Sequence, residues 1–328
     1  MQALDFLNKV ADYEGKNLFF LYGEEVYLVD RCREALLAAW NVPFPEMNLT
    51  VFQEKVSYAD LFEACIQAPC FADLRVIVLE EVDVSEKALR FADILGKLPP
   101  QSKLVLCFSK KPDMRKGIYK DLKKCAVCAE ADSLKPDALV KWMQSTAKRG
   151  GVQLSREMAE LLVEISGGEM YALKNELDKL KFAGQKRPGR AEILQIAAGS
   201  TEYDIFAFHK EMMASRYEAA FAIFEKVRRD RSALIGFLGL LVSKFAPMYM
   251  ARRCADAGMS ERQIADRLCE TTGMKPYPAL FAARDCRAFQ LEDIRRALQE
   301  LETMDHRLKS GGGMSEYRTA FLRMYGKI

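Results

Sequence analysis

The first residues that could do chemistry lie in a turn that follows a short apolar run. Residues 17–22 (NLFFLY) predict a buried strand of a parallel sheet, and Gly23, Glu24 and Glu25 separate it from a helix predicted over 27–40. In an α/β protein, a phosphate-binding loop of the form G-x-x-x-x-G-K-[ST] would lie at this position. The turn has one glycine, no Gly-Lys-Ser/Thr sequence and two carboxylates that would repel a phosphate. The sequence therefore predicts a degenerate turn with no nucleotide-binding residues.

A second acidic cluster follows the strand predicted over 74–79. Glu80, Glu81 and Asp83 resemble the carboxylates that hold Mg²⁺ at a strand end in nucleotide hydrolases. No phosphate-binding loop precedes them, and no Asp-Glu pair is present. A solvated strand end is therefore the favoured interpretation.

The remaining polar candidates are weaker still. Cys125 and Cys128 have redox or metal spacing, but no second such pair follows, and they are expected to flank a short buried strand. His209 and His306 lie on predicted helices without a nucleophile pattern. We expect no catalytic residue, no metal and no cofactor.

A basic run after the fourth predicted strand fits either phosphate contacts or a solvated helix face. It comprises Lys110, Lys111, Arg115, Lys116, Lys120, Lys123 and Lys124.

One apolar segment stands out before the third predicted strand. Pro69 ends a helix predicted over 57–67, and Cys70 and Phe71 follow in a loop. Phe71 either tucks under the sheet or projects outward as an apolar anchor for a partner, as interface hot spots do. The sequence leaves both alternatives open.

Composition limits the class of protein. The chain has 328 residues, of which 50% are hydrophobic and 29% charged, enough for two or three packed domains. A net charge of only +3 disfavours a uniformly basic nucleic-acid-binding protein. We expect no membrane span, because no window approaches about 18 uncharged apolar residues. The acidic residues near the N-terminus are unlike a signal peptide. Nine cysteines without a pairing pattern fit a cytoplasmic location.

The order of predicted elements divides the chain. Strands over 17–22, 49–54, 74–79, 103–108 and 126–129 alternate with helices, which predicts a mainly parallel sheet. These helices include 57–67, with Ser57 as N-cap, and 85–97, started by Ser85. Only helices are predicted after residue 136; two of them begin at Ser155, as N-cap, and at Ser260, and a last helix over 315–325 follows Gly311, Gly312 and Gly313. A broad apolar stripe at helical spacing comprises Leu234, Phe237, Leu238, Leu241, Val242, Phe245, Met248 and Tyr249. Net charge shifts from −4 over 1–140 to +2 over 141–203 and +5 over 204–328.

Four segments, taken in order, resemble the family of bacterial DNA polymerase III delta subunits, which act in sliding-clamp loaders. They are NLFFLYGEEVYL, PCFADLRVIVLEE, GGEMYALKNELDKL, and LGLLVSKF with DHRLKSGGG. The resemblance implies an α/β AAA+-like parallel-sheet domain over 1–136 without a phosphate-binding loop. It also implies a small helical lid over 137–203 and an all-α collar over 204–328 that joins the chain to other clamp-loader subunits in a hetero-pentamer.

The same resemblance implies a function without catalysis. In this family two adjacent apolar residues before the third strand insert into a hydrophobic pocket of the sliding clamp, and by position these are Cys70 and Phe71, next to Pro69. Binding would stabilise an opened clamp for loading onto primed DNA, while neighbouring subunits hydrolyse ATP. Cys70 is smaller than the leucine common in the family, so Phe71 carries most of the expected contact.

Two other classes of function remain as alternatives. The first is an ATPase with a degenerate phosphate-binding loop, such as a related clamp-loader or helicase-loader subunit, which would bind nucleotide as an isolated chain. The second is a free-standing nucleic-acid-binding protein, for which the net charge of +3 predicts weak affinity at physiological salt.

Overall fold

The computed structural model describes residues 1–198, 200–311 and 316–326, and it divides into two compact units, Met1–Ser133 (unit 1) and Leu134–Ile328 (unit 2). Unit 1 contains a five-stranded parallel sheet in the order β2-β3-β4-β1-β5. The strands are β1 (Leu18–Tyr22), β2 (Leu49–Gln53), β3 (Arg75–Glu80), β4 (Ser102–Phe108) and β5 (Val127–Glu130). All five strands lie within a residue or so of their predicted positions.

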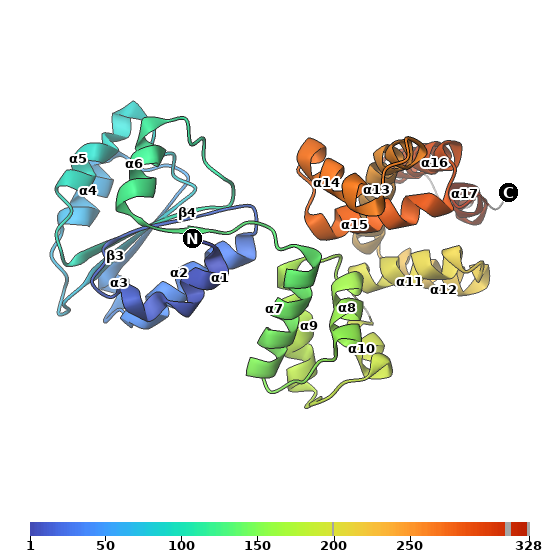
Figure 1. The fold of residues 1–328 in the computed structure, drawn as a ribbon, viewed down its shortest axis with the longest axis horizontal. Coiled ribbons are helices and arrows are strands. Elements are labelled where there is room, and N and C mark those ends of the chain that lie inside the picture. The colour runs from blue at the N-terminus through green and yellow to red at the C-terminus, as the bar shows by residue number, and fades with distance from the viewer. Residues whose placement is uncertain (199, 312–315, 327–328) are drawn as a thin grey trace. The chain divides into compact units, whose positions relative to one another are not determined.

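Helices cover both faces of this sheet (Figure 1), since its central strands are apolar on both sides. On β1, Phe20 and Tyr22 belong to the core that includes side chains of α4, α5 and α6, whereas the ring of Phe19, on the other face, packs against Trp40 of α2. This alternation follows from the period of two along a strand. The helical elements of unit 1 are α1 (Ala3–Asn8), η1 (Val10–Tyr13), α2 (Val26–Trp40), α3 (Pro45–Asn48), α4 (Tyr58–Ile66), η2 (Lys87–Leu89), α5 (Phe91–Gly96) and α6 (Gly117–Cys125).

The helix predicted over 85–97 is wrong in its first half. Ser85 does not cap a helix, because its hydroxyl and its backbone amide both bond to the Asp83 carboxylate. A single 3₁₀ turn follows, and Arg90 has a positive φ of 45°, which breaks the helical path before α5 begins.

Unit 2 is entirely helical in its described residues. Two of its helices begin where they were predicted to begin: Ser155, the predicted cap, and Ser260 each accept a hydrogen bond from the backbone amide three residues on. The helical elements are α7 (Pro136–Arg149), α8 (Arg156–Ile165), α9 (Met170–Phe182), α10 (Arg190–Ala197), α11 (Thr201–Met213), α12 (Tyr217–Val227), α13 (Arg231–Asp256), α14 (Glu261–Thr272), α15 (Pro276–Asp285), η3 (Cys286–Ala288), α16 (Leu291–Lys309) and α17 (Tyr317–Met324). Gly312, Gly313 and Ser315, expected in and after the last turn, lie outside the described residues.

The longest helix, α13, has one face in the core and one apolar face outside it. Six members of its predicted stripe are buried, namely Leu234, Phe237, Leu238, Leu241, Phe245 and Met248. Val242 and Tyr249, predicted in the same stripe, are exposed instead. By length and composition alone α13 could cross a membrane, so the prediction that no window approaches a membrane span is wrong. Its buried face belongs to the core of unit 2, and 33% of the candidate window is buried.

The predicted fold class, a parallel α/β unit followed by helices, is confirmed. The break between the two units falls after Ser133, close to the predicted boundary at 136. The further division of the helical part into a lid over 137–203 and a collar over 204–328 stays a prediction.

Candidate functional site

Phe71 lies on the surface of unit 1 and points away from the core. Its side chain is 85% exposed, and its backbone has a φ of +51°. A left-handed backbone is costly for a bulky residue and is retained where the surrounding structure holds it. The alternative in which Phe71 tucks under the sheet is therefore wrong. Pro69 and Cys70, beside it, are partly exposed.

Asn48 holds the loop that carries Phe71. Its buried side chain accepts a hydrogen bond from the Cys70 backbone amide at 2.7 Å and donates one to the Cys70 carbonyl at 2.9 Å. The same amide nitrogen donates to the carbonyl of Pro43 at 2.8 Å. Below this contact, the buried guanidinium of Arg75 donates to the carbonyls of Ala64 and Met47 and to the Thr50 hydroxyl. The loop is thus fixed to the end of α3, and Arg75 ties α3 to α4 and β2 beneath it.

A second aromatic ring, which was not predicted from the sequence, lies at this surface. Phe44 is 50% exposed, has a φ of +47°, and lies edge-to-face against Phe71 with ring centroids 6.4 Å apart. Met47, on the next turn of chain, is also about half exposed. The signal that could have found Phe44 is the sequence Pro43-Phe44-Pro45, an aromatic residue held in a loop between prolines. We call Phe44, Met47 and Phe71 the apolar surface of unit 1.

The turn at Gly23 is built differently from a phosphate cradle. Its backbone amide donates to the carbonyl of Phe108 at 3.2 Å, and the amide of Glu25 donates to the carbonyl of Ala131 at 2.9 Å. A Cβ added at Gly23 would lie 2.2 Å from the Ala131 oxygen, so the turn packs directly on the segment after β5. Phosphate-binding loops need backbone amides that point at the ligand. Here two of those amides are used inside the protein.

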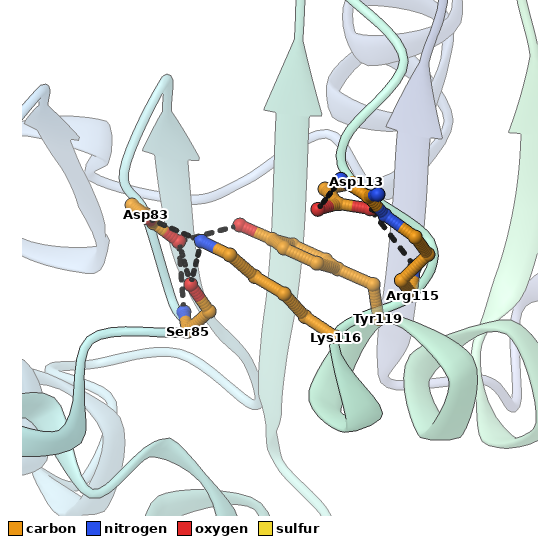
Figure 2. A network of polar contacts seen from close by, with 6 residues as sticks. All are labelled: Asp83, Ser85, Asp113, Arg115, Lys116 and Tyr119. Carbon is orange, nitrogen blue, oxygen red and sulfur yellow. Dashed lines mark hydrogen bonds and ion pairs between the residues drawn. The ribbon is translucent and has the colours of Figure 1, made fainter.

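The carboxylates after β3 also contact neighbouring side chains. Figure 2 shows Asp83 beside Ser85, Lys116 and Tyr119; the tyrosine hydroxyl donates to Asp83 at 2.8 Å and the lysine ammonium at 3.1 Å. Partial burial alone would raise the pKa of Asp83, but hydrogen bonds from Ser85, Tyr119 and Lys116 outweigh it and hold that pKa well below its usual range. Asp83 therefore acts as a local link between β3 and α6.

The other two carboxylates of this cluster have partners as well. Glu80 pairs with Arg33 of α2 and accepts from Gln53 at 2.8 Å, and Glu81 accepts from the backbone amide of Ser109. Across the described residues, no group of three or more His, Cys, Asp or Glu side chains could hold a metal ion.

Four members of the basic run have acidic partners on unit 1. Lys111 pairs with Glu130, Arg115 with Asp113, Lys116 with Asp83, and Lys124 with Asp121. Arg115 and Asp113 lie on the loop before α6, at the right of Figure 2. The run therefore extends from the end of β4 onto α6, much of it as a solvated surface.

The remaining sequence candidates are not brought together into a site. Cys125 is exposed at the end of α6 and Cys128 lies in β5, both as free thiols. His209 is buried in unit 2, where its Nδ1 lies 2.7 Å from the Tyr325 hydroxyl, and His306 is exposed on α16.

The described residues define a two-part α/β and α protein: a parallel five-stranded sheet whose first turn lacks a phosphate-binding loop, followed by a helical unit. Two sequence families match: "DNA polymerase III, delta subunit" over residues 19–132, and "DNA polymerase III delta subunit, C-terminal domain" over 202–322. The chain belongs to the DNA polymerase III delta subunit family.

Two relatives extend the match over nearly the full length. The chain is 24% identical over 313 residues to DNA polymerase III subunit delta of Bacillus subtilis strain 168, covering 90% of this chain and 88% of that protein. The solved structure of the Bacillus subtilis DNA clamp loader delta protein has a TM-score of 0.72 at 21% identity, covering 99% of this chain and 100% of the other. The second match shows that the two proteins share a fold.

Proposed function

We propose that this chain is the delta subunit of a bacterial clamp loader and that it binds and opens the sliding clamp through the apolar surface of unit 1. The observation that carries the proposal is Phe71, a phenylalanine 85% exposed and held in a left-handed conformation by buried polar contacts. Membership of the delta family supports this reading. The resemblance to the delta family implies an apolar pocket on the clamp for such an anchor, and higher affinity for an opened clamp would favour opening.

The chain acts as a binding subunit rather than an enzyme in this proposal. The amides of Gly23 and Glu25 are engaged within unit 1, and Glu24 is exposed at the same turn, where its charge opposes a phosphate. ATP hydrolysis would then take place in neighbouring subunits. The alternative of a degenerate ATPase predicts that the isolated chain binds nucleotide. Equilibrium titration with a fluorescent ATP analogue distinguishes the two, because micromolar affinity would contradict the proposal.

Residues 204–328 would join the chain to the other loader subunits and to primed DNA in the cytoplasm. Supporting this is the exposed face of α13, where Ile235, Val242 and Tyr249 recur at intervals of seven residues. Such spacing places side chains along one side of a helix, as in helix–helix interfaces. Their exposure leaves an apolar stripe available for another subunit.

The direct test is clamp affinity of a Phe71→Ala variant of the full chain. Truncating an anchor should weaken binding by about 2 kcal/mol or more. The matched control is Phe182→Ala, which removes an equally exposed ring (90%) at the end of α9 in unit 2. If Phe71→Ala has an unaltered circular dichroism spectrum and still binds the clamp with unchanged affinity, the assignment of Phe71 to the clamp-binding site is wrong.

A further inference from the structure

Two phenylalanine rings that are far apart in sequence meet on the surface of unit 1. Phe44 precedes α3 and Phe71 lies between α4 and β3, yet their rings are in edge-to-face contact at 6.4 Å. Both side chains remain at least half exposed after this contact. A ring pair that served only to stabilise the fold would be expected to bury more of its area.

Both rings share an unusual backbone conformation. Each residue has a positive φ, +47° for Phe44 and +51° for Phe71. A left-handed backbone is strained for residues other than glycine, because the Cβ comes close to the following carbonyl oxygen. Glycine or asparagine would fill these positions with less strain. Strain that recurs at two contacting, exposed aromatic residues is typical of sites that bind a ligand or partner.

One buried side chain fixes both segments. Asn48 Nδ2 donates to the carbonyl of Pro43, immediately before Phe44, and to the carbonyl of Cys70, immediately before Phe71. Its Oδ1 accepts from the Cys70 amide. The asparagine is fully buried, so these bonds are sheltered from water. Asn48 therefore sets the separation of the two rings.

The charges around the rings indicate the chemistry of the partner. The segments 41–48 and 67–74 contain two carboxylates, Glu46 and Asp73, both exposed, and no lysine or arginine. Complementary interfaces place opposite charges across the rim. The fitting partner surface is an apolar pocket wide enough for two rings, with lysine or arginine side chains at its edge.

We propose that Phe44 is a second anchor beside Phe71 and that Asn48 is the positioning residue that holds the pair for a basic-rimmed apolar pocket on the sliding clamp. This inference rests on the proposed function. It adds a residue from a different loop to the contact and makes the partner pocket a two-ring site. It also means that the small side chain of Cys70 is offset by Phe44.

The test measures affinity of the full chain for the sliding clamp encoded in the same genome, by surface plasmon resonance or calorimetry. Phe44→Ala is expected to weaken binding by about tenfold, and Phe71→Ala by about thirtyfold. Phe44→Leu keeps most of the apolar area and should stay within about threefold of the parent. Phe182→Ala serves as the control for loss of an exposed ring.

A mutant cycle, which combines Asn48→Ala with alanine at both Phe44 and Phe71, distinguishes a positioning role of Asn48 from a general loss of stability. Asn48→Ala should weaken binding about tenfold in the parent chain and leave it unchanged when both rings are already alanine. An equal loss in the two backgrounds overturns the positioning role. If Asn48→Ala does not fold, Phe44→Ala and Phe44→Leu still test the second anchor.

The outcomes distinguish the two proposals. If Phe71→Ala weakens binding but Phe44→Ala leaves it unchanged, Phe44 is not a second anchor, and the proposed function remains in place. If neither variant changes binding, the assignment of the clamp-binding site is wrong, and so is the inference that rests on it. Weakening by both variants, together with recovery in Phe44→Leu, supports the two-ring site.

Discussion

The hydroxyl of Tyr119 donates a hydrogen bond to Oδ1 of Asp83 over 2.8 Å, which connects α6 to the segment after β3 (Figure 2). In a nucleotide hydrolase, carboxylates at this edge of the sheet would face a metal ion. In this chain Asp83 is satisfied by a tyrosine, a serine and a lysine of its own unit.

This link predicts a pH-dependent contribution to stability. Since the pKa of Asp83 is lower in the folded chain than in the unfolded one, the carboxylate stabilises unit 1 above about pH 4, and the contribution is lost as the pH falls further. Asp83→Asn should lower the free energy of unfolding by about 1 kcal/mol at pH 7, after allowance for solvent screening. Urea unfolding at pH 7 and pH 3 measures the difference, which should shrink at pH 3.

Asp121 offers the matched control for that experiment. It lies on α6 with an exposed carboxylate and a single 3.5 Å contact to Lys124. Asp121→Asn should change stability by less than about 0.5 kcal/mol at either pH. A loss as large as that of Asp83→Asn would contradict a specific role for the link.

Gly23 should not accept a side chain. Its φ is +152°, and an added Cβ would lie 2.2–2.7 Å from the backbone of Ala131. Gly23→Ala is expected to destabilise unit 1 by about 3 kcal/mol or more, because backbone atoms cannot move aside as a flexible side chain can. The control is Gly117→Ala, because a Cβ added at Gly117 would have no atom within 4 Å. In thermal unfolding, the midpoint temperature of this variant should remain near that of the parent.

His209 predicts a second pH effect, in unit 2. Burial lowers the pKa of His209 to about 4, with Lys244 adding to the shift, while the facing Asp285 opposes it. The unfolded chain therefore takes up this proton first, and the free energy of unfolding should fall by on the order of 3 kcal/mol between about pH 6.5 and pH 4. His209→Gln should flatten that part of the profile, whereas substituting the exposed His306 should not.

Enlarging Cys70 should strengthen the proposed clamp contact. Leucine adds about two methylene groups of apolar surface, each worth about 0.8 kcal/mol when buried. Cys70→Leu is therefore expected to bind the clamp about tenfold more tightly, provided that the added surface enters the pocket. Cys125→Leu, at an exposed thiol on α6, is the control in the same binding assay. Unchanged affinity in Cys70→Leu would place residue 70 outside the contact.

The strands of unit 1 were predictable because their residues carry strong local signals. The β3 segment RVIVLE is rich in β-branched residues, and the β1 segment LFFLY is apolar throughout, as strands covered on both faces are. The cap at Ser57 is likewise confirmed, since its hydroxyl accepts from the Asp60 amide. These features depend on neighbours in sequence, which a single sequence displays.

The second ring of the candidate site depends on contacts that sequence does not display. Phe44 and Phe71 are 27 positions apart, and they meet because β2 and β3, which follow them, pair in parallel and because Asn48 bonds to both loops. The exposure of Val242 and Tyr249 was not predicted, for a related reason. The apolar stripe of α13 is wider than the core it faces, and periodicity alone does not say which edge is covered.

The anchoring of the Phe71 loop restricts how access to this ring could be regulated. Retracting it by a local rearrangement would break both bonds between Asn48 and Cys70 and disturb the Arg75 contacts beneath them. Under the proposed function, control by ATP-driven neighbours would therefore act through steric shielding, in which another subunit covers or uncovers a preformed protrusion. Switching of this kind would require no refolding within the chain, so its speed would be set by the motion of the shielding subunit.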